Sequence, residues 1–96
     1  MTTENCCHAT ARDAFFRDFQ VVFLSDATAN LPYPDLGYGS MSADEVHRAT
    51  LVILARDTAD VMTTETFVAR VAAASVVNQR LAANQAVDDR LAVLAR

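Results

Sequence analysis

The sequence of 96 residues contains no lysine and no tryptophan, and it has only two glycines, two prolines and two cysteines. Its eight basic residues are all arginines, and twelve acidic residues bring the net charge to −4. A slightly acidic chain without a basic cluster is a poor candidate for binding nucleic acid or an anionic membrane surface. No apolar run approaches the roughly 18 residues needed to span a bilayer, and residues 1–5 lack the features of a signal peptide. We therefore expect no nucleic-acid or membrane partner.

The two cysteines, Cys6 and Cys7, are neighbours. Adjacent cysteines cannot connect distant segments, so a disulfide scaffold is excluded and a reducing, cytoplasmic setting is expected. Cys6, Cys7 and His8 with His47 could be imagined as a metal site, but zinc ligands usually come in spaced pairs. A redox role for the cysteine pair ranks last, because vicinal disulfides are strained. We expect neither a metal nor another cofactor.

What the sequence does contain is ordinary globular composition, with 52% apolar and 21% charged residues. Residues 4–18 read as a helix with Thr3 as its N-cap. Its apolar face follows helical spacing and is widened by two phenylalanines; the face comprises Cys7, Ala11, Ala14 and Asp18, with Phe15 and Phe19. Residues 20–25 include the continuous run Val21-Val22-Phe23-Leu24, which suits a strand covered on both faces.

Residues 31–41 hold every proline and glycine of the chain and form a long loop. Ser42 and Glu45 then make a capping box. It opens a helix to about Asp57, whose inward positions are Val46, Ala49, Thr50, Ile53 and Leu54. Residues 59–62 are a second strand candidate, and Thr63-Thr64-Glu65 opens a third helix. Residues 72–96 are alanine-rich and helical, with an imperfect stripe of Val77, Leu81, Val87, Leu91 and Leu94.

The order helix, strand, helix, strand, helix predicts an α/β fold with parallel strands. Two strands are too few for a sheet with covered faces and edges. The pattern therefore looks like the carboxyl-terminal half of an α/β domain over residues 1–73, followed by a helical tail over residues 74–96.

Cys6 is the strongest candidate for chemistry. In the first turn of a helix, the partial positive charge of the helix dipole favours a thiolate. The free amides of the same turn, around Cys6 and Cys7, could point at a developing oxyanion. The alternative is that Cys6 is a buried structural cysteine, which is a common core residue.

The string TENCCHATARDA at residues 3–14 resembles the nucleophile segment of the isochorismatase-like cysteine hydrolases. That family pattern is Thr-x-x-Cys-x-x-x-Thr-x-Arg-Asp/Glu-Ala at a helix start. The resemblance continues through residues 17–22, residues 25–29 and His47, and then through ADV at residues 59–61 and TTE at residues 63–65. It covers residues 2 to about 73.

The resemblance implies a three-layer α/β/α Rossmann-like fold and a Cys-Asp-Lys triad. It implies hydrolysis of small amide or ureido substrates, with Cys6 as the nucleophile that forms a thioester. It also implies an oxyanion hole made by the backbone amide of Cys6 together with that of Asn5 or Cys7. The family's Asp and Lys lie upstream of the cysteine, and this sequence has no lysine. We therefore expect a truncated member with weak or no activity alone. The alternative is a non-catalytic α/β interaction or oligomerisation module, and in either form we expect a homo-oligomer.

Several other residues have two interpretations. Helical positions 6 and 8 point about 200° apart, so His8 is expected on the helix surface rather than in a dyad with Cys6. His47, three residues from Asp44, is expected to pack or cap locally; the alternative is a role near the site, for which the spacing gives no argument. Thr3, Asp26 and Tyr33 are possible pocket residues, although Asp26 better suits the cap of a turn.

Overall fold

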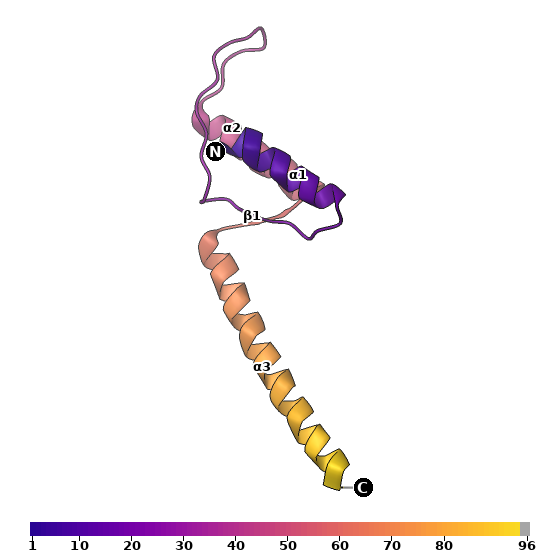
Figure 1. Cartoon of the computed structure of the whole chain (residues 1–96). Helices are drawn as coiled ribbons and strands as arrows, with labels where there is room; N and C mark the ends of the chain where they lie inside the picture. The colour runs from indigo at the N-terminus through magenta and orange to yellow at the C-terminus, as the bar shows by residue number, and fades with distance from the viewer. Residues whose placement is uncertain (95–96) are drawn as a thin grey trace. The chain divides into compact units, whose positions relative to one another are not determined.

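The computed structural model describes residues 1–94, with side chains up to residue 91 (Figure 1). The chain begins with a π-helical turn, η1 (Thr3–Cys7), which leads directly into α1 (His8–Phe16). The elements that follow are β1 (Val22–Leu24), α2 (Ala43–Asp57), β2 (Asp60–Met62) and α3 (Thr64–Leu94). Two compact units result, Met1–Thr64 and Glu65–Arg96, and we describe each by itself. The division expected after residue 73 stays a prediction.

The first unit is built on a parallel pair of strands. In the register of β1 and β2, Phe23 lies opposite Val61. Helix α2 is the crossover that joins them, as parallel strands require. The predicted α/β class and the parallel pairing are therefore confirmed.

Helix α2 begins where its sequence places the cap. The Ser42 hydroxyl accepts a hydrogen bond from the Glu45 amide at 3.1 Å, as expected for a capping box. Val46, Thr50 and Leu54 are buried at a spacing of four residues. Ile53 is 49% exposed, so its predicted inward position is wrong; the neighbouring Leu51 packs against the core instead.

The core of the first unit is small because only three residues meet at its centre. Ala11 of α1, Phe23 of β1 and Leu54 of α2 form this buried cluster, and Leu54 is completely buried. In Figure 1, α1 and α2 overlie each other and β1 runs beneath them. The cluster therefore fixes both helices to the first strand.

Helix α1 is shorter than its sequence predicts. It ends at Phe16, and Asp18 adopts a left-handed conformation with φ of 67°, which a short polar side chain tolerates. Phe15 and Phe19, expected to widen the apolar face, are 39% and 66% exposed. That expectation is wrong among the described residues, because α1 meets its neighbours through the small side chain of Ala11.

Strand β1 is covered less completely than its apolar run predicts. Phe23 is buried but Val22 is 42% exposed. The expectation of a strand covered on both faces is therefore not met by the residues that the structure describes. One face of β1 is covered by the core cluster.

The loop after β1 is closed by a short antiparallel bridge. The Tyr33 amide donates to the Met41 carbonyl at 2.9 Å, and the Met41 amide donates back at 3.1 Å. Inside the loop, the Asp35 carboxylate accepts from the amides of Gly37 and Gly39, which holds the pKa of that carboxyl below its ordinary value. Both glycines have positive φ angles, 112° and 89°, a region that favours glycine.

The second unit is the body of α3, which runs unbroken from Thr64 to Leu94. The third helix and the alanine-rich tail predicted separately are one helix, because no glycine or proline interrupts them. Val77, Leu81, Val87 and Leu91 of the predicted stripe are all exposed; the side chain of Leu94 lies outside the described residues. Within residues 1–94, no helix combines the length and apolar character that crossing a bilayer demands.

Candidate active site

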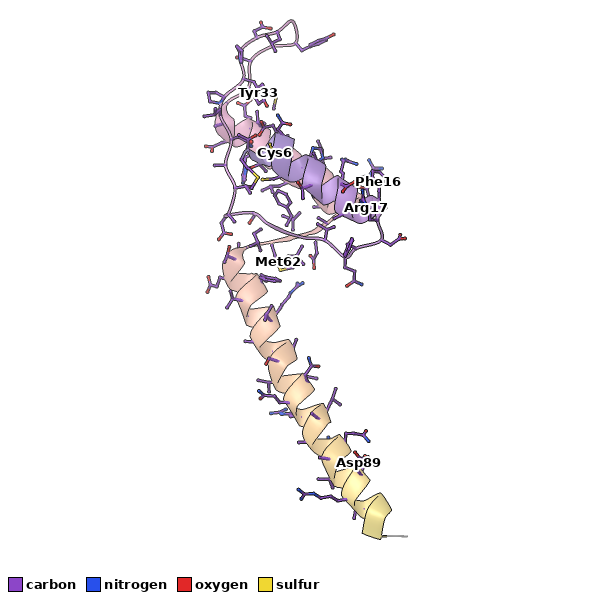
Figure 2. All side chains as sticks on the ribbon, viewed as in Figure 1. Cys6, Phe16, Arg17, Tyr33, Met62 and Asp89 are labelled. Carbon is purple, nitrogen blue, oxygen red and sulfur yellow. The ribbon has the colours of Figure 1, made fainter. Side chains whose placement is uncertain are left out.

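Cys6 lies in the turn that opens the first helix, with its side chain exposed (Figure 2). The turn is π-helical because the Cys7 amide donates to the carbonyl of Thr2, five residues earlier, at 3.3 Å. Such turns are rare and occur often at functional sites. Exposure argues against Cys6 as a structural core cysteine. Cys7 packs against the core cluster, so Cys7 is the cysteine in a structural position.

Thr3 does not cap this helix, so the predicted N-cap is wrong. The residue that flanks the turn is Thr2, with extended backbone (φ −104°, ψ 148°) and no side-chain cap bond. Thr3 lies inside the turn and is completely buried. Its hydroxyl is therefore engaged in tertiary contacts rather than with the first amides of the helix.

The backbone amides around Cys6 are directed toward the amino-terminal end of the turn. The Asn5 amide donates to the Thr2 carbonyl at 3.4 Å and the Cys7 amide donates to the same oxygen at 3.3 Å. Both distances exceed the usual 2.9–3.0 Å of such bonds. It stays a prediction that the amides of Asn5, Cys6 and Cys7 donate to an oxyanion. Two of them, those of Asn5 and Cys7, now make long hydrogen bonds to the Thr2 carbonyl.

A hydrogen-bond network anchors the turn through Thr3. The Thr3 hydroxyl lies 2.8 Å from Thr28 Oγ1 and 2.9 Å from His47 Nδ1, within hydrogen-bond distance of both. The other ring nitrogen of His47 lies 2.9 Å from the Ser25 carbonyl. His47 therefore connects α2, the end of β1 and the nucleophile turn, and the expectation that it packs or caps locally is wrong.

The segment after β1 holds the same turn from a second side. The Thr3 amide donates to the Ala29 carbonyl at 3.1 Å, and the Glu4 amide donates to Asn30 Oδ1 at 3.2 Å. The Tyr33 hydroxyl donates to Glu4 Oε1 at 2.5 Å. That bond holds the pKa of Glu4 below its ordinary value and raises the pKa of Tyr33.

Asp26 caps the start of α3. Its Oδ1 accepts from the Thr64 amide at 2.9 Å and from the Thr64 hydroxyl at 2.7 Å. The hydroxyl bond first, and the amide bond second, hold the pKa of Asp26 below its ordinary value. A capping role, which the sequence favours for Asp26, agrees with these contacts. The pocket roles of Thr3, Asp26 and Tyr33 stay predictions.

The other polar residues of the first helix pair along its surface. His8 Nε2 accepts from Arg12 Nε at 2.8 Å, and Arg17 pairs with Asp13 at 3.1 Å. An exposed pair of this kind contributes little to stability. No group of three side chains able to hold a metal ion occurs among the described residues.

An apolar groove of about 340 Å³ lies beside the site in the first unit. It runs between the inner face of α1 and strand β1; its lining includes Cys7, Ala11, Ala14, Val22 and Leu24. The exposed side of Val22 belongs to this groove. The groove therefore lies along the face of β1 that is incompletely covered.

A family model matches the part of the chain that carries these features. The model of the isochorismatase domain matches residues 1–66, which include Cys6, His47 and both strands. This match covers more than half of the chain, so the chain belongs to the isochorismatase family. The resemblance read from residues 3–14 is thereby confirmed.

Known proteins are similar to the chain in sequence or in structure. Nicotinamidase 3 of Arabidopsis thaliana is 42% identical over 53 residues, which is 55% of this chain and 21% of that protein. The cysteine hydrolase from Pseudomonas syringae pv. phaseolicola 1448A superposes with a TM-score of 0.74 and 39% identity, over 77% of this chain and 35% of that one. A predicted isochorismatase from Burkholderia xenovorans LB400 superposes with a TM-score of 0.72 and 32% identity, over 90% of this chain and 45% of that one. The chain therefore spans less than half the length of each.

The sequence located Cys6, and the resemblance included residues 25–29 and His47, but no prediction connected Thr28 and His47 to the turn that holds Cys6. Thr28 and His47 lie 25 and 44 residues from Thr3 along the chain. Periodicity reports on neighbours within one element and carries no signal for such distant pairs. A polar His47 one residue after the buried Val46 was the available sign that a polar group faces the interior.

Proposed function

We propose that Cys6 is the nucleophile of a hydrolase that cleaves the C–N bond of small amides or ureido compounds. The observation that carries the proposal is that the Cys6 thiol is exposed and lies in the opening turn of a helix, beside the backbone amides of that turn. Membership of a family with a nicotinamidase and a cysteine hydrolase supports it. The name of the first relative makes nicotinamide the first substrate to test.

In the proposed reaction, the Cys6 sulfur forms a C–S bond to the amide carbonyl carbon, and the carbonyl π electrons move onto oxygen. Collapse of this oxyanion breaks the C–N bond, and the nitrogen takes up the proton that the Cys6 thiol gave up and leaves as ammonia or an amine. Water then adds to the thioester. The C–S bond breaks, which releases the acid and restores the thiol.

The backbone around Cys6 would stabilise the oxyanion. Amides in an opening helical turn are directed at the end where negative charge is favoured. The Cys6 amide belongs to the same residue as the nucleophile, so it stays close to the carbonyl under attack. The Asn5 and Cys7 amides could also donate to the oxyanion. They would exchange their long hydrogen bonds to the Thr2 carbonyl for shorter bonds to this negatively charged oxygen, which is a stronger acceptor.

We propose that this chain alone transfers protons inefficiently during the reaction. The triad implied by the resemblance needs a lysine, and the sequence has none. His8 does not replace it, because its ring binds Arg12 along the helix. General acid–base assistance contributes about 10²–10⁴-fold to rate, so we expect acylation of Cys6 without efficient turnover.

An acylation experiment tests the proposal directly. The protein is mixed with excess p-nitrophenyl acetate, and the release of nitrophenol is followed together with the mass of the acetylated chain. We expect one equivalent to be released in a burst and the acetyl group to be found on Cys6. Ammonia release from nicotinamide and a panel of small amides measures turnover and is expected to be slow.

Cys7 provides the matched control, since it is adjacent and packed against the core. The burst should vanish in Cys6→Ala and persist in Cys7→Ala. A burst that survives Cys6→Ala, or an acetyl group found on Cys7, would contradict the proposed nucleophile. Rapid ammonia release that Cys6→Ala abolishes would uphold the nucleophile and refute weak activity.

The apolar groove beside β1 favours a second candidate, a non-catalytic module that forms a homo-oligomer. Val22 lies open in this groove, and strand edges are sites of pairing with other chains. Val22→Lys would place a charge there. Sedimentation should show an oligomer that Val22→Lys dissociates; a monomer at all concentrations would contradict this candidate and leave the hydrolase proposal intact.

A further inference from the structure

We propose that His47 is a positioning residue for Cys6, acting through Thr3. This inference rests on the proposed function, because it concerns how the nucleophile is presented. His47 touches neither Cys6 nor its amides in the hydrogen bonds described above. Its influence would pass through the turn in which Cys6 lies.

The geometry gives His47 two fixed contacts. Its Nε2 lies 2.9 Å from the Ser25 carbonyl, which can only accept, so this nitrogen carries a hydrogen. Its Nδ1 lies 2.9 Å from the Thr3 hydroxyl, which can donate or accept. Thr28 completes the hydroxyl's bonding at 2.8 Å. The single hydroxyl hydrogen of Thr3 cannot serve both neighbours, so with a neutral ring Thr3 donates to Nδ1 and accepts from the Thr28 hydroxyl.

The imidazole is held by a rigid element. His47 follows the buried Val46 on α2, and this helix is fixed to the core through the fully buried Leu54. The Ser25 carbonyl lies directly after β1. The ring thus transmits the position of α2 and β1 to Thr3 at the start of the nucleophile turn.

The turn needs such support because its own hydrogen bonds are poor. The bonds from the Asn5 and Cys7 amides to Thr2 are 3.4 and 3.3 Å long, and π-helical turns are uncommon in isolation. Cys6 is already exposed, so loosening the turn would not make its sulfur much more accessible to a reagent. It would instead move the sulfur and its amide out of their present alignment. Releasing Thr3 should therefore slow the reaction of Cys6.

Two substitutions of His47 separate its two contacts. In His47→Asn, the side-chain amide lies near the position of Nδ1 and can still meet Thr3, whereas it is too short for the Ser25 carbonyl. In His47→Gln, the amide lies near Nε2 and keeps the Ser25 contact while losing Thr3. His8→Asn is the matched control, since His8 binds only along its own helix.

The readout is the rate at which iodoacetamide alkylates Cys6 at pH 7, with tandem mass spectrometry separating Cys6 from Cys7. We expect His47→Gln to slow Cys6 by about 3- to 10-fold, the range of one net hydrogen bond. His47→Asn and His8→Asn should stay within about twofold of the unchanged protein. Equal rates in His47→Gln and His47→Asn would overturn the inference, because a merely structural histidine would not distinguish the two amides.

Two further measurements keep the test decisive. If His47→Gln does not fold by circular dichroism, Thr3→Val removes the same bond from the other side and should slow Cys6 equally; an unchanged rate would overturn the inference. The unchanged protein is also alkylated in 8 M urea. If its folded Cys6 reacts no faster than its unfolded Cys6, the proposed nucleophile fails, whatever the His47 variants show.

Discussion

Replacing Thr3 by valine should destabilise the first unit by about 1–2 kcal/mol, because the half-buried polar groups of Thr28 and His47 would each lose a hydrogen-bond partner. Thr3 is completely buried, and its hydroxyl contacts Thr28 at 2.8 Å and His47 at 2.9 Å. Valine keeps the branched shape but puts a methyl group where the hydroxyl stood. Thr28 and His47 would then both face an apolar group.

Thr50→Val is the matched control. Thr50 is also buried, at 5% exposure, but its hydroxyl donates within its own helix to the Val46 carbonyl at 2.9 Å. That carbonyl also accepts the ordinary helical bond, so it keeps a partner when the hydroxyl is removed. We expect Thr50→Val to cost less than about 1 kcal/mol.

Urea unfolding followed by tyrosine fluorescence measures both changes. The two tyrosines lie in the loop after β1, and Tyr33 binds Glu4 of the nucleophile turn, so the signal reports on the first unit. The reasoning predicts a larger loss of unfolding free energy for Thr3→Val than for Thr50→Val. Equal losses at the two positions would refute it, because they would mean that the contacts to Thr28 and His47 stabilise nothing beyond ordinary burial.

Three further predictions concern the scaffold. Leu54→Ala should cost about 2–5 kcal/mol, because Leu54 is fully buried at the centre of a small core; a loss below about 1 kcal/mol in urea unfolding would contradict that core. Ser42→Ala should cost about 1 kcal/mol through loss of the cap of α2, and Ser42→Asp should restore it; equal stability of all three proteins would argue against the cap. Asp26 has a pKa below its unfolded value because Thr64 binds its charged form, so its contribution is present above about pH 4 and lost as pH falls. Asp26→Asn should therefore flatten the acid side of the stability profile measured by urea unfolding between about pH 2 and pH 5, and an unchanged profile would count against this contact.

The sequence predicted those parts of the fold that depend on local pattern. Ser42 and Glu45 lie three residues apart in one turn, and the structure has the cap that this spacing predicts. The apolar run around Phe23 forms a strand, and the pairing of β1 with β2 is parallel. The cap and the strand follow from residues that are close in the sequence, whereas the parallel pairing follows from the order of strand, helix and strand.

The failures concern which face of an element is covered. Phe15, Phe19 and Ile53 are exposed where their spacing predicts burial. An apolar residue at the border of a helix's apolar face can be either buried or exposed. Which of the two occurs depends on the side chains that pack opposite it. Here the opposite side is formed by few residues, so the small Ala11 reaches the core and the larger side chains beside it do not.

The candidate site divides in the same way. Cys6 was found because its motif is contiguous, and its exposure agrees with the role predicted for it. The N-cap assigned to Thr3 was wrong, because a threonine before a helix equally suits a buried tertiary contact. That contact requires Thr28 and His47, whose positions are set only when β1 and α2 pack together.

The most direct measurement compares how fast iodoacetamide modifies Cys6 in the folded chain and in the same chain unfolded by urea, at neutral pH. A thiol that the opening turn of the helix activates should react several-fold faster when folded, while Cys7, packed against the core, should react more slowly when folded. Cys6 reacting no faster in the folded chain than in the unfolded one would contradict its assignment as the nucleophile.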